Sequence, residues 1–342
     1  PSAMLDDAIE IVGPEAIIDN TQKFQLINYS AINFGEVHQK PKLGGRHRTR
    51  SFVKVQDGCL NQCAFCLTTI ARGKSKSANK ESIIQYIQKL EELNVKEIVL
   101  TGVQLGSWGK DFLQKKSLFQ LIEQILKKTN IPRIRLSSIE PWDVNENLIG
   151  LFNEQRICPH LHIPVQSASN EVLKAMRRPS TKEKLFELFD MVHNKAPGVA
   201  VTTDIIVGFP DESENDFLQT IQFIKEAGLT GGHVFSFSPM PGTIATTITE
   251  QIAPTIVKDR NKTVRLLFTE LKNKYLQSRL KSNATVLFES KMRIDNNAFW
   301  TGFSEDMLRV IVPNRENLKN AIHPVELKSI NDCLIIGRLI NN

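Results

Sequence analysis

Short apolar runs alternate with amphipathic stretches along residues 51–238, and this alternation restricts the fold more than any other feature of the sequence. The apolar runs predict strands at 51–56, 96–101, 133–139, 160–165, 199–209 and 232–238, and the stretches between them predict helices at 81–94, 117–129, 144–153, 181–194 and 214–228. Strands that alternate with helices favour parallel pairing through right-handed crossovers. The sequence therefore predicts an α/β fold, a partial and open (β/α)6 version of the eight-stranded barrel, in which chemistry gathers at the strand ends.

The pattern changes after residue 238. The segment SPMPGT (238–243) interrupts it with two prolines and a glycine, and a long helix is predicted from Pro254 to Leu280. Residues 283–342 then show short alternating runs separated by Asn and Asp turns, which predict a small antiparallel all-β barrel. The expected organisation is a core at 41–253, a connecting helix at 254–281 and a barrel domain at 282–342.

The composition predicts a chain that buries a core, since 41% of its residues are hydrophobic and 23% are charged. No apolar run is long enough to cross a membrane, and the first residues lack the pattern of a signal peptide. The five cysteines are an odd number, and three of them fall within eight residues, which does not suit a secreted disulfide framework. We therefore expect a cytoplasmic protein with no membrane partner.

Positive charge is concentrated in one region of the chain. Residues 36–80 contain ten Lys or Arg and two acidic residues, an excess of eight, whereas the whole chain has a net charge of +6. Such an excess indicates either a polyanionic partner or a solvated lysine-rich loop.

Cys59, Cys63 and Cys66 form a C-x3-C-x2-C cluster directly after the first predicted strand. A structural zinc site needs four closed ligands, and only three are local here. A 4Fe–4S cluster held by three cysteines keeps one iron open for a small molecule. The spacing therefore favours an iron–sulfur cluster over a zinc site or a chance grouping of thiols.

This cysteine spacing in a six-unit α/β array resembles the radical S-adenosylmethionine (SAM) superfamily. The resemblance extends along most of the chain to the methylthiotransferases, and it is closest to the type that modifies N6-threonylcarbamoyladenosine next to the tRNA anticodon. The barrel at 282–342 resembles a TRAM domain, a small RNA-binding module. The matching segments are RTRSFVKVQDGC, ARGKSKS, KEIVLTGVQLGSWGKD, RIRLSSIEPWDV, HLHIPVQSAS, MRRPST, TTDIIVGFPDE and SPMPGT.

The resemblance implies cofactors, partners and site residues. It implies a 4Fe–4S cluster on Cys59, Cys63 and Cys66, SAM on its open iron, a tRNA substrate, a flavodoxin or ferredoxin as electron donor, and a monomer. The residues that it implies for SAM are Thr101, Gly102, Ser138, Glu140, Gln166, Ser167 and Arg177. The residues expected to meet RNA phosphates are Arg46, Arg48, Arg50, Arg72, Lys74 and Lys76.

The sequence also departs from this family. The family binds a second 4Fe–4S cluster through three further cysteines of an N-terminal domain, and these have no counterpart here, so residues 1–40 are expected to be a remnant of that domain. Ala168 and Asp211 stand where the family usually has Gly, and Thr69 where it has Pro. A radical SAM enzyme of different chemistry and a non-catalytic RNA-binding protein therefore remain alternatives.

Several other residues suit structural roles better than functional ones. His160 and His162 share one face of a strand, and hydrogen bonding is expected there rather than metal binding. Cys158 and Cys333 are expected in cores. Trp108, Trp142 and Trp300 could stack on bases, with Trp300 the best candidate, although packing is the simpler expectation.

Overall fold

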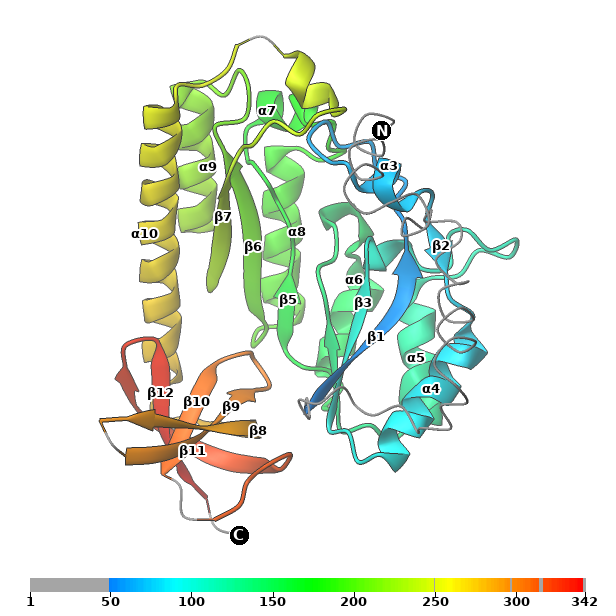
Figure 1. Cartoon of the computed structure of the whole chain (residues 1–342), viewed down its shortest axis with the longest axis vertical. Coiled ribbons are helices and arrows are strands. Elements are labelled where there is room, and N and C mark those ends of the chain that lie inside the picture. The colour runs from blue at the N-terminus through cyan, green and yellow to red at the C-terminus, as the bar shows by residue number, and fades with distance from the viewer. Residues whose placement is uncertain (1–48, 249, 296, 314–315, 341–342) are drawn as a thin grey trace, which may run out of the picture.

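The computed structural model describes residues 49–340 except 249, 296 and 314–315. The expected remnant at 1–40 and two of the expected RNA contacts, Arg46 and Arg48, lie outside the described residues. The first sheet has the order β2-β1-β3-β4 and the second the order β5-β6-β7 (Figure 1). The strands are β1 Arg50–Asp57, β2 Lys76–Ser77, β3 Glu97–Gly102, β4 Arg133–Leu136, β5 His160–His162, β6 Ala200–Val207 and β7 Gly231–Ser236.

All strand pairs of these two sheets are parallel except β1 with β2. An isolated parallel bridge between Ile134 and Ile157 joins the two sheets beside β4 and β5. The described strands thus form one curved wall that is open between β1 and β7, as the sequence predicts for a partial barrel. β4 and β5 are shorter than predicted, because pairing stops where the chain bends into the loops that carry Ser138, Glu140 and Gln166.

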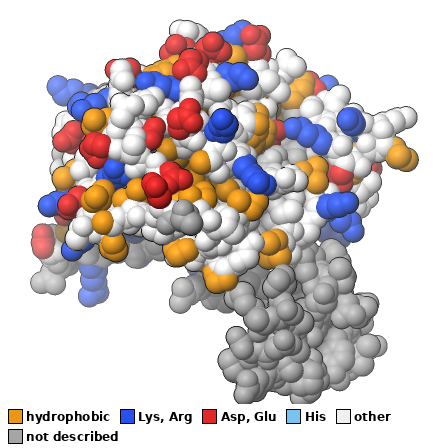
Figure 2. Space-filling view, turned by 90° about the horizontal axis from the view of Figure 1, so that it is seen from above, with side chains coloured by type: hydrophobic (Ala, Val, Ile, Leu, Met, Phe, Trp, Pro, Cys, Tyr) orange, Lys and Arg blue, Asp and Glu red, His pale blue; other side chains and the backbone are white. Residues whose placement is uncertain are grey.

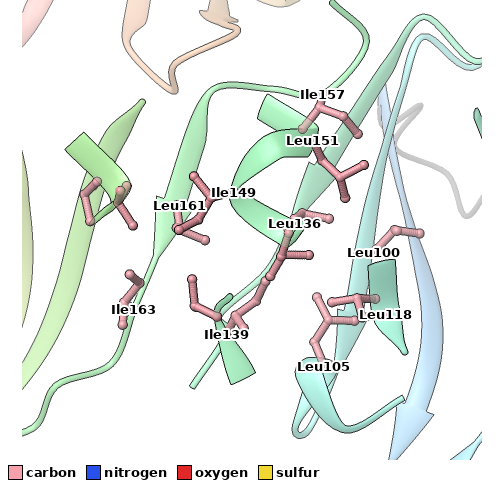
Figure 3. Packing of buried hydrophobic residues seen from close by; sticks show 14 of the residues in the cluster. Leu100, Leu105, Leu118, Leu136, Ile139, Ile149, Leu151, Ile157, Leu161 and Ile163 are labelled. Carbon is pink, nitrogen blue, oxygen red and sulfur yellow. The ribbon is translucent and has the colours of Figure 1, made fainter. Parts of the chain in front are cut away.

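Helices cover the convex face of this wall. Alternation along the strands turns Val53, Val55, Ile98 and Leu100 toward the helices, where they join one apolar core with Ile87 of α4. Figure 3 shows the neighbouring part of this core, from Leu100 and Leu105 to Leu161 and Ile163. The helices are α3 Thr68–Arg72, α4 Lys80–Glu92, α5 Leu118–Lys128, α6 Glu146–Gly150, α7 Asn170–Ala175, α8 Lys182–Lys195, α9 Glu214–Glu226 and α10 Pro254–Arg279.

Short side chains and caps fix where the helices begin. Thr181 caps α8, and its side chain accepts a hydrogen bond from the Lys184 amide. Ser213 forms a reciprocal capping box with Asp216 at the start of α9. Two elements that the sequence did not predict, α3 and α7, lie in the loops after β1 and β5 at the same end of the wall.

The C-terminal strands form a closed five-stranded barrel in the order β10-β12-β11-β8-β9. The prediction of an antiparallel barrel was wrong for one pair, since β10 and β12 run parallel where the barrel closes. Its strands are β8 Asn283–Ile294, β9 Asn297–Ser304, β10 Arg309–Pro313, β11 Ile322–Asn331 and β12 Leu334–Leu339. Helix α10 runs along β7 and leads directly into this barrel (Figure 1).

Two buried arginines attach this barrel to the half-barrel. Arg133 donates to the carbonyl oxygens of Phe303 and Thr285, and Arg135 donates to those of Ser304 and Glu305. Both arginines lie on β4, which starts at Arg133, so the barrel packs on the end of the wall opposite the loops that follow the strands. Among the described residues, no helix has the length and apolarity needed to cross a membrane.

Candidate active site

Cys59, Cys63 and Cys66 lie in the loop that follows β1, at the C-terminal end of that strand. Gly58 starts this loop with a φ of +70°, and a Cβ there would lie 2.1 Å from the Lys74 carbonyl oxygen, so the turn requires glycine. Cys59 is then fixed by its amide, which donates to the Gly73 carbonyl at 3.1 Å. The Cys66 amide closes a turn onto the Cys63 carbonyl, also at 3.1 Å.

The electrostatics of the loop disfavour bare thiolates. Burial, with smaller contributions from Glu140 and Cys66, raises the pKa of Cys59 and raises that of Cys63 to about 11, although Arg178 opposes the shift of Cys63. Backbone amides of Asn61 and Thr68 donate to the sulfurs of Cys59 and Cys66 at 3.3 and 3.4 Å. Thiolates placed here therefore need a positively charged group, and the amide donors are the kind that stabilise cluster sulfurs.

Three thiols in one loop are a donor set that an iron–sulfur cube can use. A cube places each thiolate on a different iron, so its ligands stand farther apart than those of one zinc ion. Cys59, Cys63 and Cys66 are the residues that would hold such a cluster.

Arg178 links the thiols to the end of β4. One of its terminal nitrogens donates to Glu140 Oε2 at 2.6 Å, and the other lies 3.9 Å from the Cys63 sulfur. The guanidinium also packs 4.8 Å from the ring centroid of Trp142. The sequence points to Arg177 as the site residue, but that side chain is exposed and its neighbour Arg178 is buried at the site.

Gln104 is a residue that the sequence analysis missed. Its Oε1 lies 3.4 Å from the Cys59 sulfur, and its amide nitrogen lies 3.3 Å from buried Asp143 Oδ2. Its backbone amide donates to the Gln56 side chain at 2.8 Å. Its position in GVQLG, immediately after β3, is the signal that could have identified it, because strand ends carry the chemistry of this fold.

The residues expected to contact SAM differ in their position on the strands and in their exposure. Thr101 and Gly102 end β3, and Glu140 lies beside Cys63 through Arg178. Gln166 has a φ of +70°, and its backbone N–H donates to the Asp204 carbonyl oxygen. Ser138 is exposed after β4.

Ser167 differs from this group. Its side chain is fully buried, and its hydroxyl lies 3.2 Å from the Thr220 hydroxyl. This hydroxyl therefore stabilises the fold and is not exposed at the mouth of the wall.

The expected RNA contacts separate into two groups. Arg50 forms an ion pair with Glu289 at 2.9 Å and covers the ring of Phe303, so it joins the half-barrel to the C-terminal barrel. Arg72, Lys74 and Lys76 are exposed beside the cysteine loop, as a phosphate contact would require. Seen from above this end, Figure 2 shows hydrophobic side chains gathered among charged ones.

The histidines on β5 make the hydrogen bonds expected of them. Thr202 Oγ1 lies 3.1 Å from His160 Nε2 and 2.9 Å from His162 Nδ1. His162 Nε2 also contacts Asp204 at 3.1 Å, on the concave face of the wall.

The remaining cysteines and tryptophans are mostly structural. Cys158 is buried as predicted, but the core prediction for Cys333 was wrong, because it is exposed in the turn between β11 and β12. Trp108 and Trp300 are buried, and each donates its indole N–H to a backbone carbonyl.

Comparison with known proteins places this geometry in a family. Residues 53–224 match the Radical SAM superfamily. Threonylcarbamoyladenosine tRNA methylthiotransferase MtaB of Bacillus subtilis is 33% identical over 82% of this chain and 62% of its own length. MtaB of Thermotoga maritima is 40% identical over 66% of this chain and 52% of its own length. The tRNA-2-methylthio-N(6)-dimethylallyladenosine synthase of Lachnoclostridium phytofermentans is 30% identical over 87% of this chain and 65% of its own length.

The chain thus spans about three-fifths of the length of the curated relatives that it matches. The match at residues 53–224 covers half of the chain and contains the three thiols and most of the wall that presents them. From this match, the open wall of six parallel strands and the trio of cysteines at its mouth, we conclude that the chain belongs to the radical SAM superfamily.

Proposed function

We propose that this protein is a radical SAM tRNA methylthiotransferase that adds a methylthio group to carbon 2 of N6-threonylcarbamoyladenosine next to the anticodon. The observation that carries the proposal is the set of Cys59, Cys63 and Cys66 at the mouth of the half-barrel, in a chain similar to methylthiotransferases over most of its length. When bound, the 4Fe–4S cluster with SAM supplies the radical that activates the target C–H bond.

The chain's own residues would hold and orient these groups. The three thiolates would bind the cluster, and Arg178 would offset their negative charge from its position beside Cys63. Glu140, fixed by Arg178, and Thr101 at the end of β3 would contact SAM. Arg178 and Glu140 are mostly buried, so this pair is ordered before any ligand arrives, which lowers the cost of binding.

The concave face of the wall favours a polar substituent on the target base. Alternation of side chains along the strands places Lys54, His162, Asp204 and His233 on this face. A threonylcarbamoyl group carries a carboxylate and a hydroxyl that can pair with such side chains, whereas a dimethylallyl group can only bury them. These four polar side chains support the threonylcarbamoyl substrate over the dimethylallyl one, and the exposed Phe52 and Phe235 of the same face leave room for the base itself.

The proposal includes an RNA-binding role for the C-terminal barrel. The barrel is attached by Arg133 and Arg135 at a fixed position below the wall, so RNA held on the barrel would keep a constant distance from the thiols. The exposed Arg72, Lys74 and Lys76 would contact phosphates at the other end.

The test is anaerobic reconstitution of the full chain with iron and sulfide. We expect a brown protein with about four irons and four sulfides per chain, and 5′-deoxyadenosine after SAM and a reductant are added. With sulfide supplied as the sulfur donor and a second SAM as the methyl donor, nucleoside mass spectrometry of tRNA that lacks the modification would then detect the methylthio product. Absence of iron would overturn the proposal, and a product only on dimethylallyladenosine would overturn the substrate assignment.

A further inference from the structure

Helix α10 lies beside the free edge of β7 and leaves a groove there. Two adjoining cavities of about 650 and 320 Å³ occupy this groove, and both are lined by Arg265. We call this the β7–α10 groove. The side chains that carry the argument are Lys258, Asn261, Arg265 and Lys272 on α10 with His233 and Phe235 on β7.

The cations of the groove form one row. Lys258, Arg265 and Lys272 are seven residues apart, so they share one flank of α10 and span about 21 Å along it. None of the residues lining the two cavities is acidic. By the same periodicity, Asp259 and Glu270 fall on the opposite flank, so the helix separates its charges.

These three cations are available to a ligand. All three side chains are exposed, and none forms an ion pair with another residue of the described chain. Arg265 donates to Asn261 at 2.9 Å, and Asn261 in turn donates to Ser236 on β7 at 3.2 Å. The guanidinium is thus held over the groove while its other donors remain free.

Aromatic side chains line the other wall of the groove. Val234 packs against the core, so alternation turns His233 and Phe235 to the concave side of β7. Phe235 is 53% exposed, and the His233 ring contacts His162 at a centroid distance of 6.2 Å. Exposed rings beside a row of cations are the combination that binds single-stranded nucleic acid, because bases stack on rings while phosphates meet the cations.

The groove also connects the two ends of the molecule. The cavity of about 650 Å³ is lined by Gly208 and Pro239, which lie at the end of the wall where the thiols are. At the other end of α10, Arg279 and Tyr275 both donate to Asp306 of the C-terminal barrel. A strand lying in the groove would therefore run between the barrel and the mouth of the wall.

We propose that the β7–α10 groove binds the single-stranded RNA segment next to the nucleotide that is modified. The inference rests on the proposed function, since it assumes an RNA substrate. The cations of α10 hold the phosphates, and the β7 rings stack on one or two bases. The groove lies at the open side of the half-barrel, so a nucleotide of the bound segment can turn onto the concave face.

The experiment measures binding of the full chain to a fluorescent stem–loop RNA between about 50 and 200 mM salt. The test variant is Lys258→Gln/Arg265→Gln/Lys272→Gln. The matched control is Lys184→Gln/Lys225→Gln/Lys274→Gln, which removes the same charge from exposed positions outside the groove. We expect the test variant to bind at least tenfold more weakly and to lower the slope of log K against log salt by about 2, whereas the control changes little.

A second variant tests the aromatic wall. Phe235→Ala should weaken stem–loop binding by about 5- to 150-fold without changing the salt slope, because it removes stacking and no charge. A blunt RNA duplex of the same stem should bind wild type and Phe235→Ala equally, since its bases are not available for stacking.

The outcomes separate this inference from the proposed function. If the wild-type chain does not bind the stem–loop, the RNA substrate itself is wrong. If the wild type binds and the test triple variant behaves like the control, the groove assignment alone is overturned. If the triple variant loses affinity but Phe235→Ala does not, stacking on β7 is overturned.

Discussion

Arg178 donates a hydrogen bond of 2.6 Å to Glu140 and approaches the Cys63 sulfur at 3.9 Å, so one guanidinium serves both a carboxylate and a thiol. The two side chains come from segments 38 residues apart, one after β4 and one after α7. Burial raises the pKa of Glu140, and Arg178 opposes that shift. The arginine is thus the group that keeps negative charge tolerable beside the proposed cluster.

The first prediction concerns this pair. Arg178→Met leaves the mostly buried Glu140 without its cation, and we expect it to lower the free energy of unfolding by about 3 kcal/mol. Urea unfolding of the apoprotein measures the loss. The double variant Arg178→Met/Glu140→Gln should recover about half of it, because the uncompensated carboxylate is then gone. A double variant no more stable than Arg178→Met would contradict the coupling.

The second prediction concerns the thiols. Replacing Cys59, Cys63 or Cys66 by Ala should each abolish the brown chromophore after reconstitution and reduce bound iron to near zero, since a cube with two protein ligands is not retained. Iron and sulfide assays measure this directly. Cys333→Ala is the control, because that thiol is exposed in the C-terminal barrel and should leave iron content unchanged. Full iron in any of the three variants would remove that residue from the ligand set.

The third prediction concerns the attachment of the C-terminal barrel. Arg135 is buried, bonds Glu97 at 2.8 Å and donates to two barrel carbonyls. Arg135→Met should cost about 3 kcal/mol, since buried Glu97 then keeps only the more distant Arg133, at 3.6 Å, and the two barrel carbonyls lose a donor. Thermal unfolding and limited proteolysis near residue 281 would detect it. Arg338→Met removes an arginine that is 72% exposed and should leave both measurements unchanged.

The fourth prediction is a pH dependence of stability. Burial, with a smaller contribution from Arg135, lowers the pKa of His160 to about 3. The unfolded chain protonates this histidine near pH 6.5, so it binds more protons than the folded chain between about pH 3 and 6.5. The contribution of His160 to the free energy of unfolding is therefore complete above about pH 6.5 and is lost as the pH falls. The loss is about 2 kcal/mol at pH 5.

His160→Gln should remove this contribution. Unfolding free energies of wild type and variant, measured from pH 7 to pH 5, should converge as the pH falls, because only the wild type gains a proton on unfolding. A constant difference between the two proteins over that range would show that His160 has the same pKa in the folded and unfolded chains.

The sequence predicted the parts of this protein that depend on local periodicity and short spacing. The six strands and the helix from Pro254 follow from residues within a few positions of each other. The trio of thiols was also readable, because all three lie in one loop after β1. Such features need no knowledge of distant contacts.

Tertiary structure decided which side chains reach the site. Arg177 and Arg178 are equivalent in sequence, but Arg177 has a φ of +57°, and the chain turns so that only Arg178 enters the buried position beside Glu140. The backbone of Asp211 also adopts a left-handed conformation, with a φ of +64°. The glycine that is usual at this position in the family would adopt it without strain.

Long-range pairing decided the rest. Arg50 could not be separated from the other basic residues by composition, yet its partner Glu289 is 239 residues away. Gln104 gains its role only because β1 and β3 pair and bring it to Cys59, 45 residues earlier. Local patterns therefore determined the elements and the thiols, whereas the electrostatic surroundings of the site required the folded chain, because charges interact through space rather than along the sequence.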